Sequence, residues 1–376
     1  MNFKINKKAF LDALVISNKA LSPNTPLPVL NGIYLEVQEE SIILMSSDSN
    51  ISIRTELNNN VDKILKVSET GKTVLDSKYL TEIVRKIPGS EISIETVDGS
   101  IIGISGGSSS FKLNCIDADE YPRIDFSCNS EPFVIEGKIL KEVIDDTIFA
   151  CSDSVVRPVL TGVNFKAEGH NLRVSASDSY RVAIRNVTLE NEENFNITIP
   201  SKHLNDVYGS INEEDSVKIK IDNQKIIFDF GNTLVLTRLL DDEFPNVSKL
   251  IPSSFMQTLI VNRSDFKAAI DRTSFIKMDG KNIIKMSINS QKMDITSFNA
   301  QSSSFETLGI VSYTGDPLEI TCRGNYLQDA LNTLKGDEVT LNFCGPLKPI
   351  VMTAESNKNL LQLVSPFRSY YVINQF

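Results

Sequence analysis

The feature that most constrains this chain is a repeat: one pattern occurs three times, at a period of one small domain. Each copy holds a helical stretch, a hydrophobic turn before a strand, a second helix and a strand run that ends at a proline. The second helix of each copy carries a ring side chain near its start, at Tyr79, His203 and Tyr326. The closing prolines are Pro122, Pro245 and Pro366. Both sets of landmarks recur every 121 to 124 residues, so the sequence predicts three similar domains.

The chain length agrees with three domains. A domain of roughly 125 residues can bury its own core, and we expect the domains at residues 1–125, 126–250 and 251–376. The apolar fraction of 41% is ordinary for a soluble globular protein. No apolar run approaches the roughly 20 residues of a membrane span. The start of the chain lacks the long apolar core of a signal peptide, so we expect a cytoplasmic protein.

The periodicity of apolar residues changes in the same order within each copy. Residues 7–21 predict a helix with one buried face, made of Phe10, Ala13, Leu14 and Ser17. Asp76 or Ser77 is a candidate N-cap for the second helix. Further helices are predicted at residues 138–149, 201–211, 264–276 and 325–334. Two helices and about eight strands per copy predict an α+β fold, in which helices pack on antiparallel sheet.

Side chains suited to catalysis or metal binding are sparse. Five cysteines are scattered without paired spacing, which fits reduced thiols and predicts neither disulfides nor a zinc site. Neither of the two histidines has metal-ligand spacing. One alternative is a hydrolase that uses Ser201, His203 and Asp206, although positions i and i+2 of a helix do not face each other. We expect no catalytic residue, no cofactor and no metal.

The charge of the chain leaves its partners open. A net charge of −10 argues, by itself, against nucleic acid, because affinity for phosphates comes from clustered lysine and arginine. A ring or a cleft can separate charges of opposite sign, so the location of the cations matters. The predicted helices carry outward lysines and arginines among acidic residues, and none of them is a basic stripe. A soluble repeat scaffold without a nucleic-acid role is therefore a second alternative.

One segment carries a family resemblance. Residues 174–183, Val-Ser-Ala-Ser-Asp-Ser-Tyr-Arg-Val-Ala, resemble the threonine-aspartate-x-histidine-arginine-leucine-alanine signature in the middle domain of bacterial sliding clamps, the beta subunit of DNA polymerase III. Residues 27–30, 242–245 and 364–368 match further landmarks of that family in the same order. The resemblance covers essentially the whole chain. It departs from the family at Tyr180, where histidine is frequent, and at Ser365, where a larger apolar residue is usual.

The resemblance implies a fold, a function and partners. It implies the DNA clamp fold, with three similar domains per chain and a head-to-tail homodimer that closes into a ring around double-stranded DNA without sequence preference. A sliding clamp is a non-catalytic processivity factor within a DNA polymerase holoenzyme. It tethers the replicative polymerase, and it binds the clamp loader, other polymerases and repair proteins through short peptide motifs. No membrane partner is implied.

The resemblance also implies three sets of site residues. The peptide-binding pocket comprises Leu160, Ser177, Ser179, Tyr180, Arg181, Val182, Pro245, Lys249, Leu250, Tyr326, Leu363, Val364, Pro366, Phe367 and Arg368. The DNA-binding residues are Lys78, Arg85, Arg157 and Lys202. The dimer interface comprises Phe111, Leu113, Phe275 and Ile276. The chain continues beyond Arg368 for eight more residues, a tail whose role the resemblance does not give.

Overall fold

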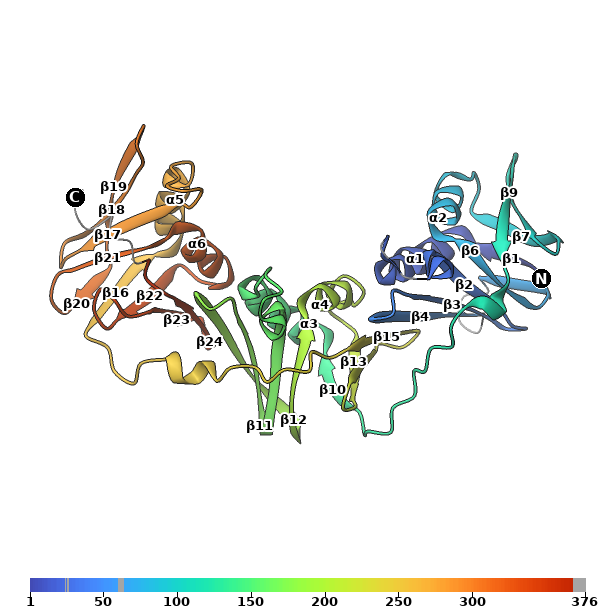
Figure 1. Ribbon diagram of the computed structural model, residues 1–376, viewed down its shortest axis with the longest axis horizontal. Helices are drawn as coiled ribbons and strands as arrows, with labels where there is room; N and C mark the ends of the chain where they lie inside the picture. The colour runs from blue at the N-terminus through green and yellow to red at the C-terminus, as the bar shows by residue number, and fades with distance from the viewer. Residues whose placement is uncertain (24, 26, 60–63, 368–376) are drawn as a thin grey trace. The chain divides into compact units, whose positions relative to one another are not determined.

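The computed structural model describes residues 1–23, 25, 27–59 and 64–367 (Figure 1). These residues form two compact units. The first unit comprises Met1–Leu140 and Lys202–Leu239, and the second comprises Lys141–Ser201 and Leu240–Phe376. None of the helices in the described part of the chain is long and apolar enough to cross a membrane.

The helices and strands follow the repeat. The first repeat has α1 (Lys7–Ser17) and α2 (Ser77–Lys86), with strands β1 (Asn2–Asn6), β2 (Gly32–Val37), β3 (Ser41–Ser47), β4 (Ile51–Asn58), β5 (Leu65–Glu69), β6 (Gly71–Asp76), β7 (Glu91–Asp98), β8 (Ile101–Gly106) and β9 (Ser109–Ile116). The second has α3 (Gly137–Thr147) and α4 (Ser201–Tyr208), with β10 (Phe133–Glu136), β11 (Gly162–Ser177), β12 (Arg181–Pro200), β13 (Ser216–Ile221), β14 (Lys225–Asp229) and β15 (Thr233–Arg238). The third has α5 (Arg263–Thr273) and α6 (Gly324–Thr333), with β16 (Gln257–Asn262), β17 (Ile283–Ile288), β18 (Lys292–Phe298), β19 (Ser303–Gly309), β20 (Ser312–Thr314), β21 (Leu318–Arg323), β22 (Glu338–Phe343), β23 (Ile350–Ala354) and β24 (Asn357–Val364).

Local sequence explains where the helices begin. The side chain of Asn6 accepts a hydrogen bond from Ala9 N at 3.1 Å and caps α1. Asp76, one of the two predicted candidates, caps α2 in the same way, through Tyr79 N at 3.1 Å. The predicted apolar face of α1 is confirmed, since its buried residues are Phe10, Ala13, Leu14 and Ser17. All strand pairs among the described residues are antiparallel, and α1 packs on β3 and β4 while α5 packs on β16, β18 and β19. The α+β class is therefore confirmed.

The second repeat differs from the prediction of about eight strands per copy. Within the described residues the three repeats have nine, six and nine strands. The second repeat has fewer because β11 and β12 are 16 and 20 residues long and pair along almost their whole length, with one register shift after Gly169. Strand β11 therefore takes the place of two shorter strands, and β12 takes the place of three.

Sheet pairing crosses from each repeat to the next. In the first unit, β15 of the second repeat pairs with β4 of the first, with Thr237 opposite Ile51 and Thr233 opposite Thr55. In the second unit, β24 of the third repeat pairs with β12 of the second, from Arg181 opposite Val364 to Arg185 opposite Leu360. We call the β4–β15 ladder the first joint and the β12–β24 ladder the second joint.

The joints explain why the compact units do not follow the repeats. Strands β10 and β13–β15 of the second repeat belong to the thirteen-stranded sheet of the first unit, whereas β11 and β12 belong to the seven-stranded sheet of the second. The domain boundaries at residues 125 and 250 therefore stay a prediction. Separate apolar cores lie in the first repeat, around Phe3 and Phe10, and in the third, around Phe266 and Phe343.

Candidate functional site

A tight turn between β11 and β12 presents the residues of the predicted signature. Asp178 Oδ1 accepts hydrogen bonds from Tyr180 N at 2.8 Å and Arg181 N at 2.9 Å. Ser177 Oγ donates to Arg181 O at 2.8 Å and accepts from Ser179 N at 3.1 Å. Ser179 has a φ of 77°, a backbone conformation that residues other than glycine rarely adopt. The turn is therefore held by its own side chains, and it projects Tyr180 outward.

Arg181 ties this turn to helix α6. Its Nε lies 3.0 Å from Asp178 Oδ2, and its Nη1 lies 2.5 Å from Asp329 Oδ2. The guanidinium carbon is 4.5 Å from the centre of the Tyr326 ring. The Arg181 side chain is only 13% exposed, so its charge depends on these partners and is strongly held in place.

A second arginine, Arg323, completes the polar part of the site. Its Nη1 donates to the hydroxyl of Tyr326 at 2.7 Å, and its guanidinium carbon lies 4.9 Å from the Tyr180 ring and 6.0 Å from the Phe367 ring. Burial, followed by the negative charge of Asp178, raises the pKa of Tyr326 above its usual value. The sequence reasoning missed Arg323, whose only signal was its place directly before the predicted α6.

An apolar cluster lies on the other side of the β12–β24 ladder. We call it the junction cluster; it comprises Val159, Leu160, Val182, Ile184, Phe244, Val247, Val351 and Leu363. Val182 is directly opposite Leu363 in the ladder, and Ser365 N continues the contact by donating to Tyr180 O at 2.8 Å. Leu250, at 51% exposed, and Tyr180, at 54%, remain open to solvent. The second and third repeats thus both contribute to the junction cluster.

The other predicted pocket residues differ in burial, and Val364 packs in the core of the third repeat instead of the junction cluster. Pro245, Lys249 and Ser179 are exposed, Ser177 and Val364 are buried, and Pro366 and Phe367 are partly buried. Phe367 N donates to Thr321 O at 2.7 Å, which fixes the chain beside β21. Arg368 and the tail that follows it lie outside the described residues.

The four predicted DNA-binding side chains are all exposed. Lys78 and Arg85 lie on α2, Lys202 lies on α4, and Arg157 precedes the short helix at Pro158–Thr161. Arg85 pairs with Glu82, and Lys202 Nζ lies 4.0 Å from Asp48 Oδ2.

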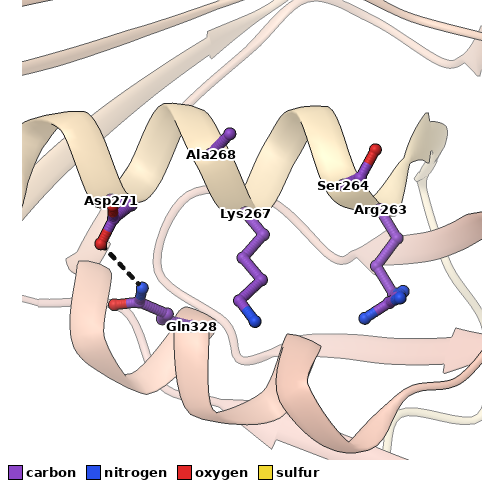
Figure 2. A pocket seen from close by; sticks show the side chains of 6 residues that line it. All are labelled: Arg263, Ser264, Lys267, Ala268, Asp271 and Gln328. Carbon is purple, nitrogen blue, oxygen red and sulfur yellow. Dashed lines mark hydrogen bonds between the residues drawn. The ribbon is translucent and has the colours of Figure 1, made fainter.

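Helices α5 and α6 of the third repeat border a shallow depression of about 440 Å³. Figure 2 shows Lys267 and Arg263 extending from α5 toward α6, and Asp271 bonded to Gln328 at 3.3 Å. Arg263 Nε donates to Gly336 O at 2.8 Å. The third repeat therefore also presents cations on its helices, although the sequence reasoning had not assigned them to a site.

The four predicted interface residues are not equivalent in the chain. Phe111 is 37% exposed and Leu113 is partly buried on β9. Phe275, two residues after the end of α5, is 73% exposed, whereas Ile276 is 1% exposed. Ile276 thus packs within its own chain, whereas Phe275 and Phe111 are exposed to solvent.

Comparisons with known proteins agree along the chain. Family models for the three domains of the DNA polymerase III beta subunit match this chain: the N-terminal domain at residues 1–125, the central domain at 134–246 and the C-terminal domain at 248–368. The beta sliding clamp of Staphylococcus epidermidis is 34% identical over 376 residues, which cover 98% of this chain and 100% of that protein. This chain belongs to the DNA polymerase III beta subunit family.

Solved structures of the family share the fold. The DNA polymerase sliding clamp of Bacillus subtilis superposes with a TM-score of 0.94 at 32% identity, covering 98% of this chain and 100% of that one. The DNA polymerase III beta chain of Streptococcus pneumoniae gives a TM-score of 0.94 at 28% identity, with the same coverage. The predicted clamp fold with three similar domains is therefore confirmed.

Family membership does not favour the hydrolase alternative, and the geometry around His203 agrees. His203 is 7% exposed, and its Nδ1 lies 2.5 Å from the hydroxyl of Thr237 on β15. Burial lowers its pKa below the usual value. The imidazole therefore serves as a buried contact of the first joint, and it faces Thr237 instead of a nucleophile on its own helix.

Proposed function

We propose that this protein is a non-catalytic, cytoplasmic sliding clamp, in which two copies close head to tail around duplex DNA and tether polymerases to it. One observation carries the proposal. The two joints within the chain have the same construction, and the first and third repeats each present one unpaired strand edge that could form half of a third such joint.

The two unpaired strand edges follow from the strand order. The last strand of the second repeat, β15, completes the sheet of the first repeat at β4, and the last strand of the third, β24, completes that of the second at β12. The equivalent last strand of the first repeat is β9, and the equivalent receiving strand of the third repeat is β19. Among the described residues, β19 pairs only with β18, and β9 pairs only with β8 over residues 109–114. Pairing of β9 with β19 of a second copy covers both edges.

Matching turns set the register of this third joint, which we call the seam. Asp48, Asp178 and Asn299 each accept two backbone N–H bonds in the turn before the receiving strand. Carrying the first-joint pairs over to these positions places Phe111 opposite Ser304 and Leu113 opposite Ser302 of the partner copy. These side chains point to the helix-covered face of the sheet, where α5 ends.

The same equivalence separates the roles of Phe275 and Ile276. Ile276 corresponds to Ala20 and Ala150, which are each 0% exposed in their own repeats. Phe275 corresponds to Lys19, whose Nζ lies close to Gly209, directly after α4 of the second repeat. We therefore assign Phe275, with Phe111 and Leu113, to the apolar part of the seam, and Ile276 to the support beneath it.

DNA contact is proposed for the helices. The cations at Lys78, Arg85, Arg157 and Lys202, together with Lys267 and Arg263, give each repeat some positive charge within an acidic protein. Few phosphate contacts give weak binding without sequence preference, which permits sliding. The closed ring, and not the strength of these contacts, then keeps the protein on the DNA.

Partner peptides are proposed to bind at the junction cluster and its rim. Apolar side chains of both repeats lie beside exposed Leu250, Tyr180 and Lys249. Such a surface suits a short peptide with glutamine and spaced leucine or phenylalanine residues, anchored by one or two apolar side chains. The polymerase, the clamp loader and repair proteins are proposed to share it.

Retention on closed DNA tests this proposal. The protein should bind linear duplex weakly and in a salt-sensitive way, and after loading by a clamp loader it should remain on a nicked circular duplex. Cutting the circle should release it. Release from the intact circle at the same rate as from the linearised one would refute enclosure.

A further inference from the structure

A partly buried polar network crosses the second joint. Arg185 lies at the end of the β12–β24 ladder, and its side chain is 13% exposed. Its Nη2 is 3.6 Å from Glu142 Oε2 and its Nε is 3.7 Å from Asp146 Oδ2, both on α3. Its Nη1 donates to Asn357 Oδ1 on β24. Arg185 therefore links a helix of the second repeat to a strand of the third.

Two more side chains of the third repeat join this network. Lys335, just after α6, places its Nζ 3.5 Å from Glu142 Oε1. Gln362 Nε2, 1% exposed as a residue, donates to Asp146 O at 3.0 Å and to Thr333 Oγ1 at 2.9 Å. The end of α3 is thus fastened to β24 and to the end of α6.

The first joint shows that the ladder does not require this network. By the matching turns and helix starts, Asp146 and Arg185 correspond to Ile16 and Thr55 of the first repeat. There Thr55 meets Thr233 through their hydroxyls at 3.2 Å. A depression of about 470 Å³ beside Ile16 and Thr55 occupies the place of the charged network. A joint of the same construction therefore forms with a pair of threonines in place of the arginine network.

Buried ion pairs recover little net stability, because removing the charges from water costs about as much as their attraction returns. Their effect here is to hold the two repeats in a fixed arrangement. The ladder spans five residue pairs, and an arginine stands at each end of it on the same face of β12. Arg181 fastens one end to Asp329 of α6, and Arg185 fastens the other to α3 and Asn357.

We propose that Arg185 is a positioning residue for the peptide-binding surface, which it holds in register without touching the peptide. The inference rests on the proposed peptide function. The junction cluster takes Leu160 and Val182 from the second repeat and Val351 and Leu363 from the third. A peptide contacts the whole surface only when the two repeats are fixed against each other. If only a fraction of the protein molecules has the repeats in this arrangement, the apparent affinity for the peptide falls in proportion to that fraction.

The test exchanges the network for the pair that the first joint uses. The variant carries Asp146→Ile with Arg185→Thr in the full-length protein. The probe is a fluorescein-labelled synthetic nonapeptide with one glutamine and spaced leucine and phenylalanine residues. Stopped-flow anisotropy should show association slowed about tenfold, as for a surface competent in about one molecule in ten, with an unchanged dissociation rate.

Two further variants serve as controls. Thr55→Val changes the equivalent position of the first joint and should leave both rate constants as in the wild type. Arg185→Lys keeps the charge and should restore association to within about twofold of the wild-type rate. If circular dichroism shows that the double variant is not folded, Arg185→Met takes its place and is compared with Arg185→Lys.

The outcomes separate this inference from the proposed function. If the wild type binds no peptide, the peptide function fails and the inference fails with it. If the wild type binds and the folded double variant binds at the same rates, the network is only structural and the inference alone is overturned. Faster dissociation with unchanged association would mean that Arg185 contacts the peptide, which also overturns it.

Discussion

Replacing Phe275 with aspartate should convert the dimer to a monomer while each chain stays folded. The side chain is 73% exposed in the single chain, so about 150 Å² of it is available for burial at the seam, given that a phenylalanine buries roughly 200 Å². At about 25 cal/mol per Å² this is worth up to about 4 kcal/mol. A head-to-tail dimer has two seams, so each substitution acts twice.

The expected increase in the dissociation constant of the dimer is large even if only half of that area is buried. A loss of about 2 kcal/mol at each of two seams weakens dimerisation by roughly 4 kcal/mol, or about a thousandfold in Kd. An introduced carboxylate facing Phe111 and Leu113 adds a desolvation cost to this loss. Sedimentation equilibrium over a range of concentrations measures the Kd directly.

A matched control is Met256→Asp. Met256 is 68% exposed and lies just before β16, in a different sheet of the third repeat from β19. It should leave the Kd unchanged. The reasoning is refuted if Phe275→Asp remains as tight a dimer as the wild type, or if Met256→Asp dissociates equally. Ile276→Asp, in contrast, should unfold the third repeat, because that side chain is 1% exposed.

Three further predictions concern other parts of the chain. Lys78→Ala with Lys202→Ala should lower the slope of log binding constant against log salt by about 1.8 on linear duplex, since each phosphate contact contributes about 0.9; an unchanged slope in filter binding removes these two residues from the DNA-binding set. Ser179→Val should destabilise the protein in urea by about 1 to 2 kcal/mol, because a β-branched residue tolerates the φ of 77° poorly, whereas Ser179→Gly should stay close to the wild type. Burial raises the pKa of Asp146 to about 6, against the opposing charges of Arg185 and Lys335 and with the support of Glu142 and Asp145. The folded protein therefore holds this proton more tightly than the unfolded chain does, so this contribution to stability is complete below about pH 4 and is lost as the pH rises to 6. In the wild type the free energy of unfolding should fall by up to about 3 kcal/mol in that pH window, and Asp146→Asn should remove this fall. If urea denaturation gives the same pH dependence of the free energy of unfolding for both proteins from pH 4 to 7, the prediction is contradicted.

The local parts of the fold could be predicted because their causes are local. The apolar spacing in α1 and the cap at Asp76 depend on residues within a few positions of each other. The pairing of Thr55 with Thr233 joins residues 178 apart, and no local pattern marks it. The long β11 and β12 were missed for a similar reason, since only their mutual pairing makes each one continuous.

The candidate site was predicted where the family signature is contiguous. Residues 177–182 and the end of β24 come together as the resemblance implied, because the β12–β24 ladder sets Val182 opposite Leu363. Arg323 was missed since its role arises from three rings that belong to separate segments. Phe275 and Ile276 are adjacent and both apolar, so only burial within the repeat distinguishes them.

The first joint also bears on how the chain is made. Ribosomes add about 5 to 20 residues per second, and Thr233 follows its partner Thr55 by 178 residues, so the edge of β4 waits roughly 10 to 35 seconds for its neighbour. During that time β4 presents Arg54 and Glu56, which pair with each other at 2.7 Å, and charged side chains on an open edge discourage pairing with the wrong strand. The first two repeats thus complete their sheets only after the next repeat has emerged, and in the proposed dimer the last repeat waits for a second chain.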